Sequence, residues 1–348
     1  MGYMPYGTDY MTSKINVSFK AVFWAIFSFA VQSVVMTWGN QKEFNTEDNF
    51  KSYVRVLYFT LRLINTNTTI FFFLIWWEMP KIIRYVNKWL DFEEKMSSVA
   101  GVPKLSLTPQ RVKWITAVFT VLLILIITTD QYLFYNRFCP ILVLTYFFST
   151  YMNLLLSIFW ILNCIFIAGM ASNLRNSLVN LLLTKPDREL VNAHRLLWVE
   201  LRDQVNQFAE AMRLPFMIHI FINHIALIFN TYTLLTVILA SKDTSILIDV
   251  ILPQIWTVVT VVSICEAAHY ACQEIGQKFI CTVLSGKSSF HDVSITKEVD
   301  LLLETMQKNH PEIVLGGCIS VGRGLLIQTI TAELTYNIVL SQFDLSIY

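Results

Sequence analysis

Seven apolar stretches of this 348-residue chain are each long enough to cross the hydrocarbon core of a membrane. They cover residues 15–38, 53–78, 112–130, 140–171, 214–241, 248–271 and 318–343. A helix rises about 1.5 Å per residue, so about 20 apolar residues span a core about 30 Å thick. Because a backbone in lipid must satisfy its own hydrogen bonds, we expect an all-α, multi-pass membrane protein with seven transmembrane helices.

The basic residues are divided unevenly between the two sides of these spans. With the N-terminus placed in the cytoplasm, 20 of the 26 Lys and Arg residues lie in inner segments and 6 lie in outer ones. Inner loops of membrane proteins carry an excess of Lys and Arg. We therefore expect a cytoplasmic N-terminus and an extracellular C-terminus, opposite to the arrangement of a G-protein-coupled receptor, which is the first alternative class.

Composition argues against several other functions. The net charge is +1, without the concentrated basic face that nucleic-acid binding needs. The six cysteines form no CxxC pair and no cluster with histidine, so we expect no metal site and no cofactor. No nucleophile with its base and no phosphate-binding glycine loop is visible, so an enzyme is not expected. A secondary transporter would usually contain an internal repeat, and none is found.

Helical patterns extend beyond the membrane on the inner side. The fourth span continues to about Leu183, and a charged pattern at 194–212 leads directly into the fifth span. Residues 292–309 form an amphipathic helix, and 79–96 form a further piece with Pro80 at a helix start. We expect a cytoplasmic helical layer, although ordinary interfacial helices would give the same patterns.

These features divide the chain into four expected parts. Residues 1–14 form a cytoplasmic segment, and 15–271 form a six-helix ligand-binding bundle with cytoplasmic extensions. Residues 272–317 form cytoplasmic anchor helices. Residues 318–348 form the seventh helix and a short extracellular C-terminus.

A polar stripe follows one face of the last span. Counting back from Gln342 in steps of four and three residues gives Ile338, Thr335, Thr331, Gln328 and Gly324. This heptad-like spacing places them on one helix face. Several copies of the helix could turn this face to a water-filled axis, with Phe343 beside its outer end. Contacts between the helix and its own bundle would explain the stripe equally well.

Two acidic residues within the spans need partners. Glu333 lies off the stripe, and we expect it to contact Tyr336 or a neighbouring helix. Glu266 and His269 are three residues apart on the sixth span. Because no third ligand is evident, we expect a satisfied pair at this position rather than a metal or proton site.

The end of the chain carries a motif. Thr335-Tyr336, five mainly apolar residues and Gln342-Phe343 resemble the TYhhhhhQF signature that closes insect gustatory receptors, the taste branch of the insect chemoreceptor channels. The inverted seven-helix layout and the long inner helices are similar too. The N-terminal tail and inner loops, by contrast, are short for the family.

The resemblance implies a homotetrameric, ligand-gated, non-selective cation channel of the plasma membrane. The seventh helix of each subunit would line a central pore, and the cytoplasmic layer would join the subunits. Gln342 and Phe343 would form or flank the outer constriction, while Thr335 and Tyr336 would hold the helix in place. The stripe adds Ile338 as an apolar ring that could gate by dewetting.

The resemblance also implies a ligand pocket in the outer half of the other six helices. The chain offers aromatic and hydrogen-bonding side chains there: Arg62, Asp130, Asn153, Trp160, Asn230, Tyr232, Gln254 and Trp256. This mixture suits a hydroxyl-rich ligand, so we expect a sugar such as fructose, with a bitter compound as the alternative. Each of these residues could instead form a helix–helix hydrogen bond or belong to an interfacial aromatic belt.

Overall fold

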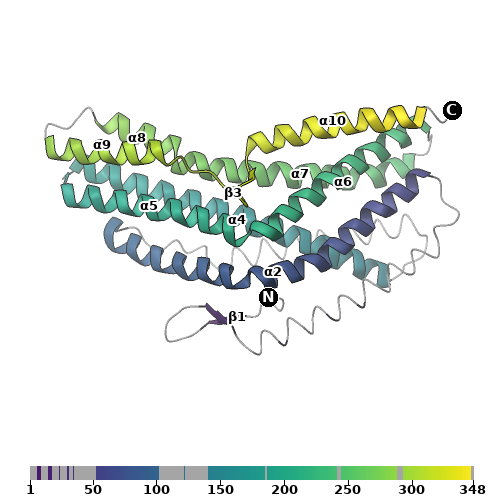
Figure 1. Ribbon diagram of the computed structural model, residues 1–348, viewed down its shortest axis with the longest axis horizontal. Coiled ribbons are helices and arrows are strands. Elements are labelled where there is room, and N and C mark those ends of the chain that lie inside the picture. The colour runs from purple at the N-terminus through teal and green to yellow at the C-terminus, as the bar shows by residue number, and fades with distance from the viewer. Residues whose placement is uncertain are drawn as a thin grey trace.

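The computed structural model shows long helices lying side by side along one axis (Figure 1). It describes residues 6–8, 15–17, 23, 30, 34, 52–101, 121, 140–184, 186–240, 244–287 and 293–345. Nearly all of the expected third span, 112–130, and most of the first, 15–38, lie outside the described residues. The number of spans and the orientation in the membrane therefore stay predictions.

The described elements are helices and two short hairpins. In chain order they are β1 (Tyr6–Thr8), β2 (Ile15–Val17), α2 (Ser52–Ala100), α4 (Pro140–Thr184), α5 (Arg188–Ala211), α6 (Arg213–Ala240), α7 (Thr244–Ile275), α8 (Gln277–Lys287), α9 (Val293–Lys308), β3 (Val314–Leu315), β4 (Ile319–Ser320) and α10 (Arg323–Leu345). β1 pairs with β2 and β3 with β4, both antiparallel. The prediction of a helical protein is confirmed for these residues.

The long inner helices are present. α4 is one helix of 45 residues, about 68 Å long at helical rise and twice the thickness of a hydrocarbon core. α5 begins after Asp187, whose side chain accepts a hydrogen bond from the Glu189 amide, and it breaks only at Met212 before α6. α9 buries one face, formed by Val299, Leu302, Leu303 and Met306, as its sequence pattern predicts.

Three stretches of the described chain are long and apolar enough to cross a membrane. They are Asn153–Thr184, Arg213–Ile238 and Gln254–Ser285. α10 is not among them, because Glu333 and the polar stripe make it less apolar than these helices. A helix of this composition cannot face lipid on all sides without exposing polar groups to hydrocarbon.

Two expected helix starts are wrong. Residues 15–17 form strand β2, so the first span cannot begin at residue 15. The last span was expected from residue 318, but α10 begins at Arg323. The preceding residues form the β3–β4 hairpin, which turns at Gly316 and Gly317 with φ of 60° and 71°. Glycine adopts this left-handed conformation without steric cost, so the chain turns here and the helix starts later.

Pro80 is also not at a helix start. It lies inside α2, which continues from Ser52 to Ala100. A proline inside a helix removes one hydrogen bond and costs about 3 kcal/mol. Residues on both sides of it, including Met79, Ile82 and Tyr85, are buried in the core. This burial holds α2 together across Pro80, so 79–96 is a continuation of the second span.

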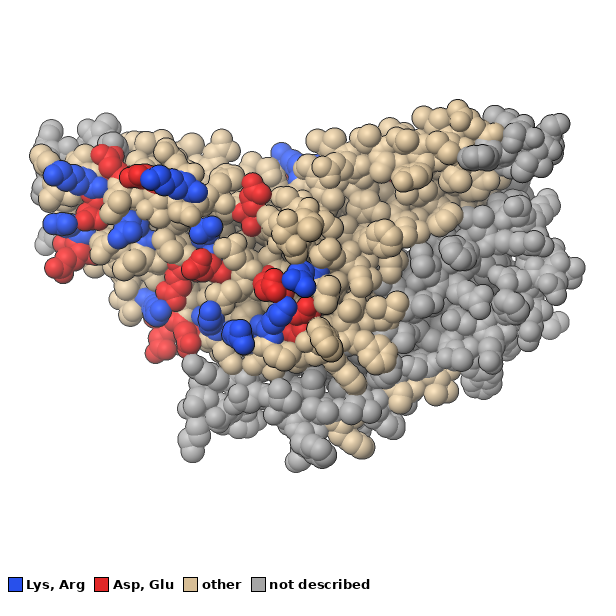
Figure 2. Space-filling view, in the orientation of Figure 1, with Lys and Arg blue, Asp and Glu red and all other residues tan. Residues whose placement is uncertain are grey.

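Charge divides the molecule along its long axis. Figure 2 shows Lys, Arg, Asp and Glu gathered over the half of this face that contains α5 and α9, whereas the described residues of the other half are almost all uncharged. α8 and α9 lie at the end opposite the C-terminal end of α10 (Figure 1). This arrangement matches a membrane-embedded half and a water-exposed helical layer.

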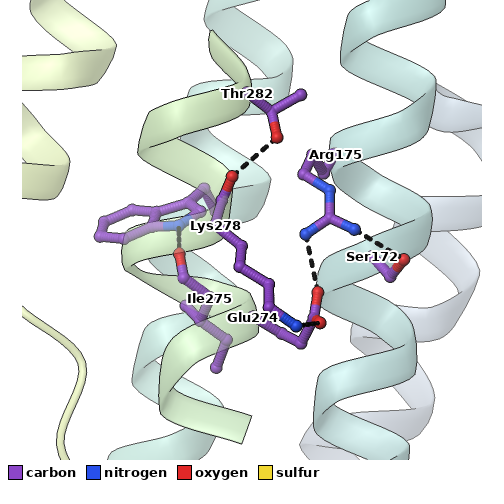
Figure 3. Close-up of polar contacts among 7 residues, drawn as sticks. Ser172, Arg175, Glu274, Ile275, Lys278 and Thr282 are labelled. Atoms are coloured by element: carbon purple, nitrogen blue, oxygen red, sulfur yellow. Dashed lines mark hydrogen bonds and ion pairs between the residues drawn. The ribbon is translucent and has the colours of Figure 1, made fainter. Parts of the chain in front are cut away.

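A polar joint links the two halves where α7 ends. The α7 helix breaks at Gly276, whereas the expected domain boundary between residues 271 and 272 falls inside it. Glu274 bridges Arg175 Nη1 at 2.7 Å and Lys278 Nζ at 2.6 Å (Figure 3). The indole of Trp198 donates a 3.0 Å hydrogen bond to the carbonyl of Ile275, the last residue of α7. These contacts fix α4, α5 and α7 to one another at the base of the membrane half.

Candidate functional site: the last helix and its partners

One face of α10 is bonded to α6 and α7. At the N-terminal end of α10, Arg323 donates to both carboxylate oxygens of Glu266 on α7, at 2.8 and 2.9 Å. Further along, the Thr329 hydroxyl is hydrogen-bonded to Nε2 of His224 on α6. Nδ1 of this histidine lies 2.7 Å from the Ile220 carbonyl. Nδ1 is therefore the donor to Ile220, and the Thr329 hydroxyl also donates to the Leu325 carbonyl of its own helix at 2.8 Å.

A third contact lies further towards the C-terminal end of α10. Glu333 Oε1 accepts a 2.5 Å hydrogen bond from the Thr231 hydroxyl on α6. The side-chain amide of Gln254 on α7 lies 2.5 Å from the same hydroxyl and 3.4 Å from Glu333. Asn337 is buried on this face and donates to the Glu333 carbonyl at 2.8 Å. Glu333 therefore joins three helices at one point.

The polar stripe lies on the opposite face of α10. Glu333 is nine residues after Gly324 and nine before Gln342, which is about two and a half helical turns in each direction. The stripe residues Gly324, Gln328, Thr331, Thr335, Ile338 and Gln342 are all exposed in the single chain. The Thr331 and Thr335 hydroxyls donate to carbonyls of their own helix, at 2.9 and 2.8 Å. Among the described contacts, none joins the stripe to the bundle of its own chain.

The motif residues Thr335 and Tyr336 do not anchor α10 within its own subunit. Both side chains are exposed, and Tyr336 keeps 56% of its surface accessible. Among the α10 side chains that the structure describes, the buried ones are instead Thr329 and Asn337. Phe343 lies in the helix, but its side chain is not among those described.

Three of the expected ligand residues, Trp160, Asn230 and Gln254, are buried or bonded within the described helix bundle. Trp160 is fully buried and stacks on Phe216, with ring centroids 3.9 Å apart and an interplanar angle of 15°. Gln254 contacts Thr231 and Glu333, and Asn230 is 3% exposed. Trp160 is therefore a core residue, and Gln254 is a helix–helix contact.

The other expected ligand residues are either less buried or outside the described side chains. Asn153, Tyr232 and Trp256 are half-buried. The backbone of Arg62 lies in α2, but its side chain is not described, and Asp130 lies outside the described residues. A crevice between α6, α7 and α10 is lined by residues that sequence analysis did not select: Ile220, Asn223, His224, Val261, Ile264, Cys265 and Leu325. Its volume of about 10 Å³ is close to the least that one water molecule needs, so it does not hold a tastant.

Sequence analysis assigned the wrong partner to one acid and missed several contacts. Glu266 pairs with Arg323 and not with His269, whose Nε2 has no hydrogen-bond partner in the described structure. Glu333 bonds to a neighbouring helix, which was one of two expectations, and Tyr336 is not its partner. The spacing of residues along one helix gives no signal for partners on other helices.

The sequence of this chain is similar to those of known membrane receptors. The 7tm Chemosensory receptor family matches residues 1–347. The chain is 25% identical over 351 residues to gustatory and odorant receptor 22 of Anopheles gambiae, covering 99% of this chain and 74% of that protein. It is also 25% identical over 341 residues to gustatory and odorant receptor 21a of Drosophila melanogaster, covering 94% and 73%.

The fold is similar to that of the insect olfactory receptor OR5 from Machilis hrabei. The TM-score is 0.71 at 13% identity, with 98% of this chain and 94% of that chain covered. The same receptor in complex with eugenol gives a TM-score of 0.60. These matches confirm the resemblance found in the last helix, and they point to a family of receptors and not of enzymes. The chain therefore belongs to the 7tm chemosensory receptor family and is a multi-pass protein of the plasma membrane.

Proposed function

We propose that this chain is a gustatory receptor that works as a ligand-gated, non-selective cation channel. Four copies assemble around a central axis, and α10 of each copy lines the pore. Gln342 and Phe343 form or flank the outer constriction, and Ile338 forms an apolar ring one turn further in.

The observation that carries this proposal is the two-sided chemistry of α10. One face is bonded to α6 and α7 through Arg323, Thr329 and Glu333. The other presents hydroxyls and amides away from the subunit. Unpaired amides are costly in hydrocarbon, so the exposed polar face needs water or another copy of the chain. A pore between identical subunits supplies both.

The ligand is a small organic molecule. The named relatives are gustatory and odorant receptors, and one structural relative binds eugenol. A sugar such as fructose is our specific candidate, supported by the half-buried Asn153, Tyr232 and Trp256, which combine aromatic faces with hydrogen-bonding groups. A bitter compound is the alternative, because the internal contacts of Trp160 and Gln254 reduce the polar surface left for a sugar.

Recording from cells that express this chain alone tests the proposal. We expect a cation current in a non-excitable cell during application of one member of a panel of sugars, bitter compounds and volatile aromatics. The pore variant is Gln342→Ala, and Ile330→Ala is its matched control, because Ile330 is exposed on the same helix but lies off the stripe. A current whose unitary conductance changes with Gln342→Ala and not with Ile330→Ala supports the pore.

Two results would overturn the proposal that this chain is a channel. One is a receptor that binds a ligand at the cell surface without current. The other is a current with identical permeation in wild type and Gln342→Ala. Epitope tags at the two termini of intact cells test the orientation separately, since an extracellular N-terminus would instead favour a G-protein-coupled receptor.

A further inference from the structure

The outward face of α2 changes chemistry along its length. From Ile70 to Asp91, seven exposed residues recur every three or four positions, which places them on one face. In order they are Ile70, Phe73, Trp77, Pro80, Arg84, Lys88 and Asp91; Leu90 is exposed beside this face, and Glu94, Lys95 and Ser98 are exposed beyond it. The face is thus apolar and aromatic first, then basic, then acidic. A helix that leaves hydrocarbon through a headgroup layer into water has this order of side chains.

An ion pair shows where along α2 the exposed face changes from apolar to charged. Lys81 Nζ lies 2.9 Å from Glu78 on its own helix and 2.9 Å from Glu210 at the end of α5. Glu210 immediately precedes the membrane-length stretch of α6, which begins at Arg213. The segment of α2 around Lys81 therefore lies at the edge of the membrane-embedded half.

Trp77 marks the apolar side of that edge. Its side chain is 78% exposed, the largest exposure of the exposed large hydrophobic residues in the described structure. Tryptophan is enriched at the membrane–water interface, where its ring sits at the headgroup level. Arg84 follows seven residues later, about 10 Å further along the helix, and Lys88 about 16 Å. A long basic side chain that reaches back towards the membrane brings its charge into the headgroup layer.

Arg84 and Lys88 carry charge that the described part of the protein does not neutralise. Lys81 shares its charge with two carboxylates. In the described structure, by contrast, neither Arg84 nor Lys88 has an acid within ion-pair distance, and both are exposed. Two unpaired cations one helical turn apart, below an exposed tryptophan, complement a phosphate group.

We propose that Trp77, Arg84 and Lys88 form a binding site for an anionic phospholipid of the cytoplasmic leaflet. Trp77 contacts the glycerol and upper acyl region, the Arg84 guanidinium binds a phosphate through two parallel hydrogen bonds, and Lys88 adds a second positive charge. Lipids with more than one phosphate bind best, because both cations are then engaged. The site rests on the proposed orientation, which places this end of α2 in the cytoplasm.

Lipid binding to the purified full-length receptor tests the site without a tastant. The receptor is titrated with short-chain phosphatidylinositol bisphosphate and bound lipid is counted by native mass spectrometry, with phosphatidylcholine as the neutral comparison. Each surface cation contributes about a 5-fold gain in affinity, so Arg84→Gln with Lys88→Gln should weaken binding about 25-fold. Lys297→Gln with Lys308→Gln is the matched control, because it removes the same charge from exposed sites on α9. This control should bind as the wild type does.

Three outcomes would overturn the proposal. Equal weakening by the α2 and α9 pairs would show diffuse attraction to a basic surface. Equal binding of soluble inositol trisphosphate, without gain from the lipid chains, would show a site for a free phosphate. Dissociation of oligomers by the α2 pair, without lost lipid, would show that this face contacts another copy of the chain. A receptor that binds the lipid but conducts no ions would refute the proposed channel and leave the lipid site standing.

Discussion

Replacing Glu333 by alanine tests whether its contacts hold α10, the proposed pore helix, in a closed position. Glu333 is the one described residue of α10 that bonds to both α6 and α7, through Thr231 and Gln254. A ligand that moves α6 or α7 would disturb this point directly. We expect Glu333→Ala to raise the basal current and to lower the ligand concentration needed for half-maximal opening.

The contact geometry sets the size of the effect. Interhelical hydrogen bonds in membranes are worth about 0.6 kcal/mol on average and up to about 2 kcal/mol. The 2.5 Å bond to Thr231 is close, and the 3.4 Å contact with Gln254 is weak. Thr231 and Gln254 remain bonded to each other at 2.5 Å, so the substitution does not leave both unpaired. We therefore expect a loss of about 1–2 kcal/mol, which shifts the closed–open equilibrium about 5- to 30-fold if opening breaks the contact.

A double-mutant cycle of Glu333→Ala and Thr231→Val isolates the contact. Open probability is measured at a fixed ligand concentration, alongside thermal unfolding of the purified protein. Thr236→Val is the matched control on α6, because its hydroxyl bonds only to the Tyr232 carbonyl of its own helix. If the effects of Glu333→Ala and Thr231→Val on opening are additive, or only the unfolding temperature changes, the contact stabilises the fold and does not control the gate.

Three further predictions address other positions. Gln342→Ala should change unitary conductance and leave surface expression and ligand potency intact in single-channel recordings. Glu266→Arg and Arg323→Glu should each raise basal current, and their combination should restore it, since the reversed pair can bond again. Burial lowers the pKa of His194 below its ordinary value of 6.5, so as pH falls below about 6.5 the unfolded chain binds a proton that the folded chain does not. The unfolding temperature should therefore fall between about pH 7.5 and pH 5.5, and it should fall less in His194→Gln.

Local pattern was sufficient to predict most of the described helices. Hydrophobic periodicity and length reflect the backbone of one segment, and they placed α4 and α9 within a few residues of their observed bounds. The predicted helix start at Pro80 was wrong. The cost of an internal proline can be read from the local sequence, whereas the burial that offsets it comes from contacts with α4, α5 and α6. The late start of α10 depends on the hairpin that turns at Gly316, because its second strand, β4, is apolar enough for a hydropathy window to include it in the span.

The candidate site was predicted only in part, because side-chain identity does not specify what a side chain faces. Trp160 and Gln254 have the chemistry of a sugar pocket, yet one stacks in the core and the other bonds to α6 and α10. The partner of Glu266 is 57 residues away in sequence. No helical spacing relates residues so far apart. The stripe was found because its members share one helix, and its exposure became visible only with the bundle in place.

The division of α10 into two polar faces has a consequence for assembly of the proposed channel. In a lone subunit, the face with Gln328, Thr331 and Gln342 would meet lipid, and burying an unpaired amide in an apolar medium costs several kcal/mol. The contacts through Glu266 and Glu333 hold the opposite face against α6 and α7, so the helix cannot rotate to hide the stripe without breaking them. The lone subunit is therefore disfavoured whichever way α10 turns. Assembly around a water-filled axis relieves this conflict, so the same residues that would line the pore also drive the subunits together.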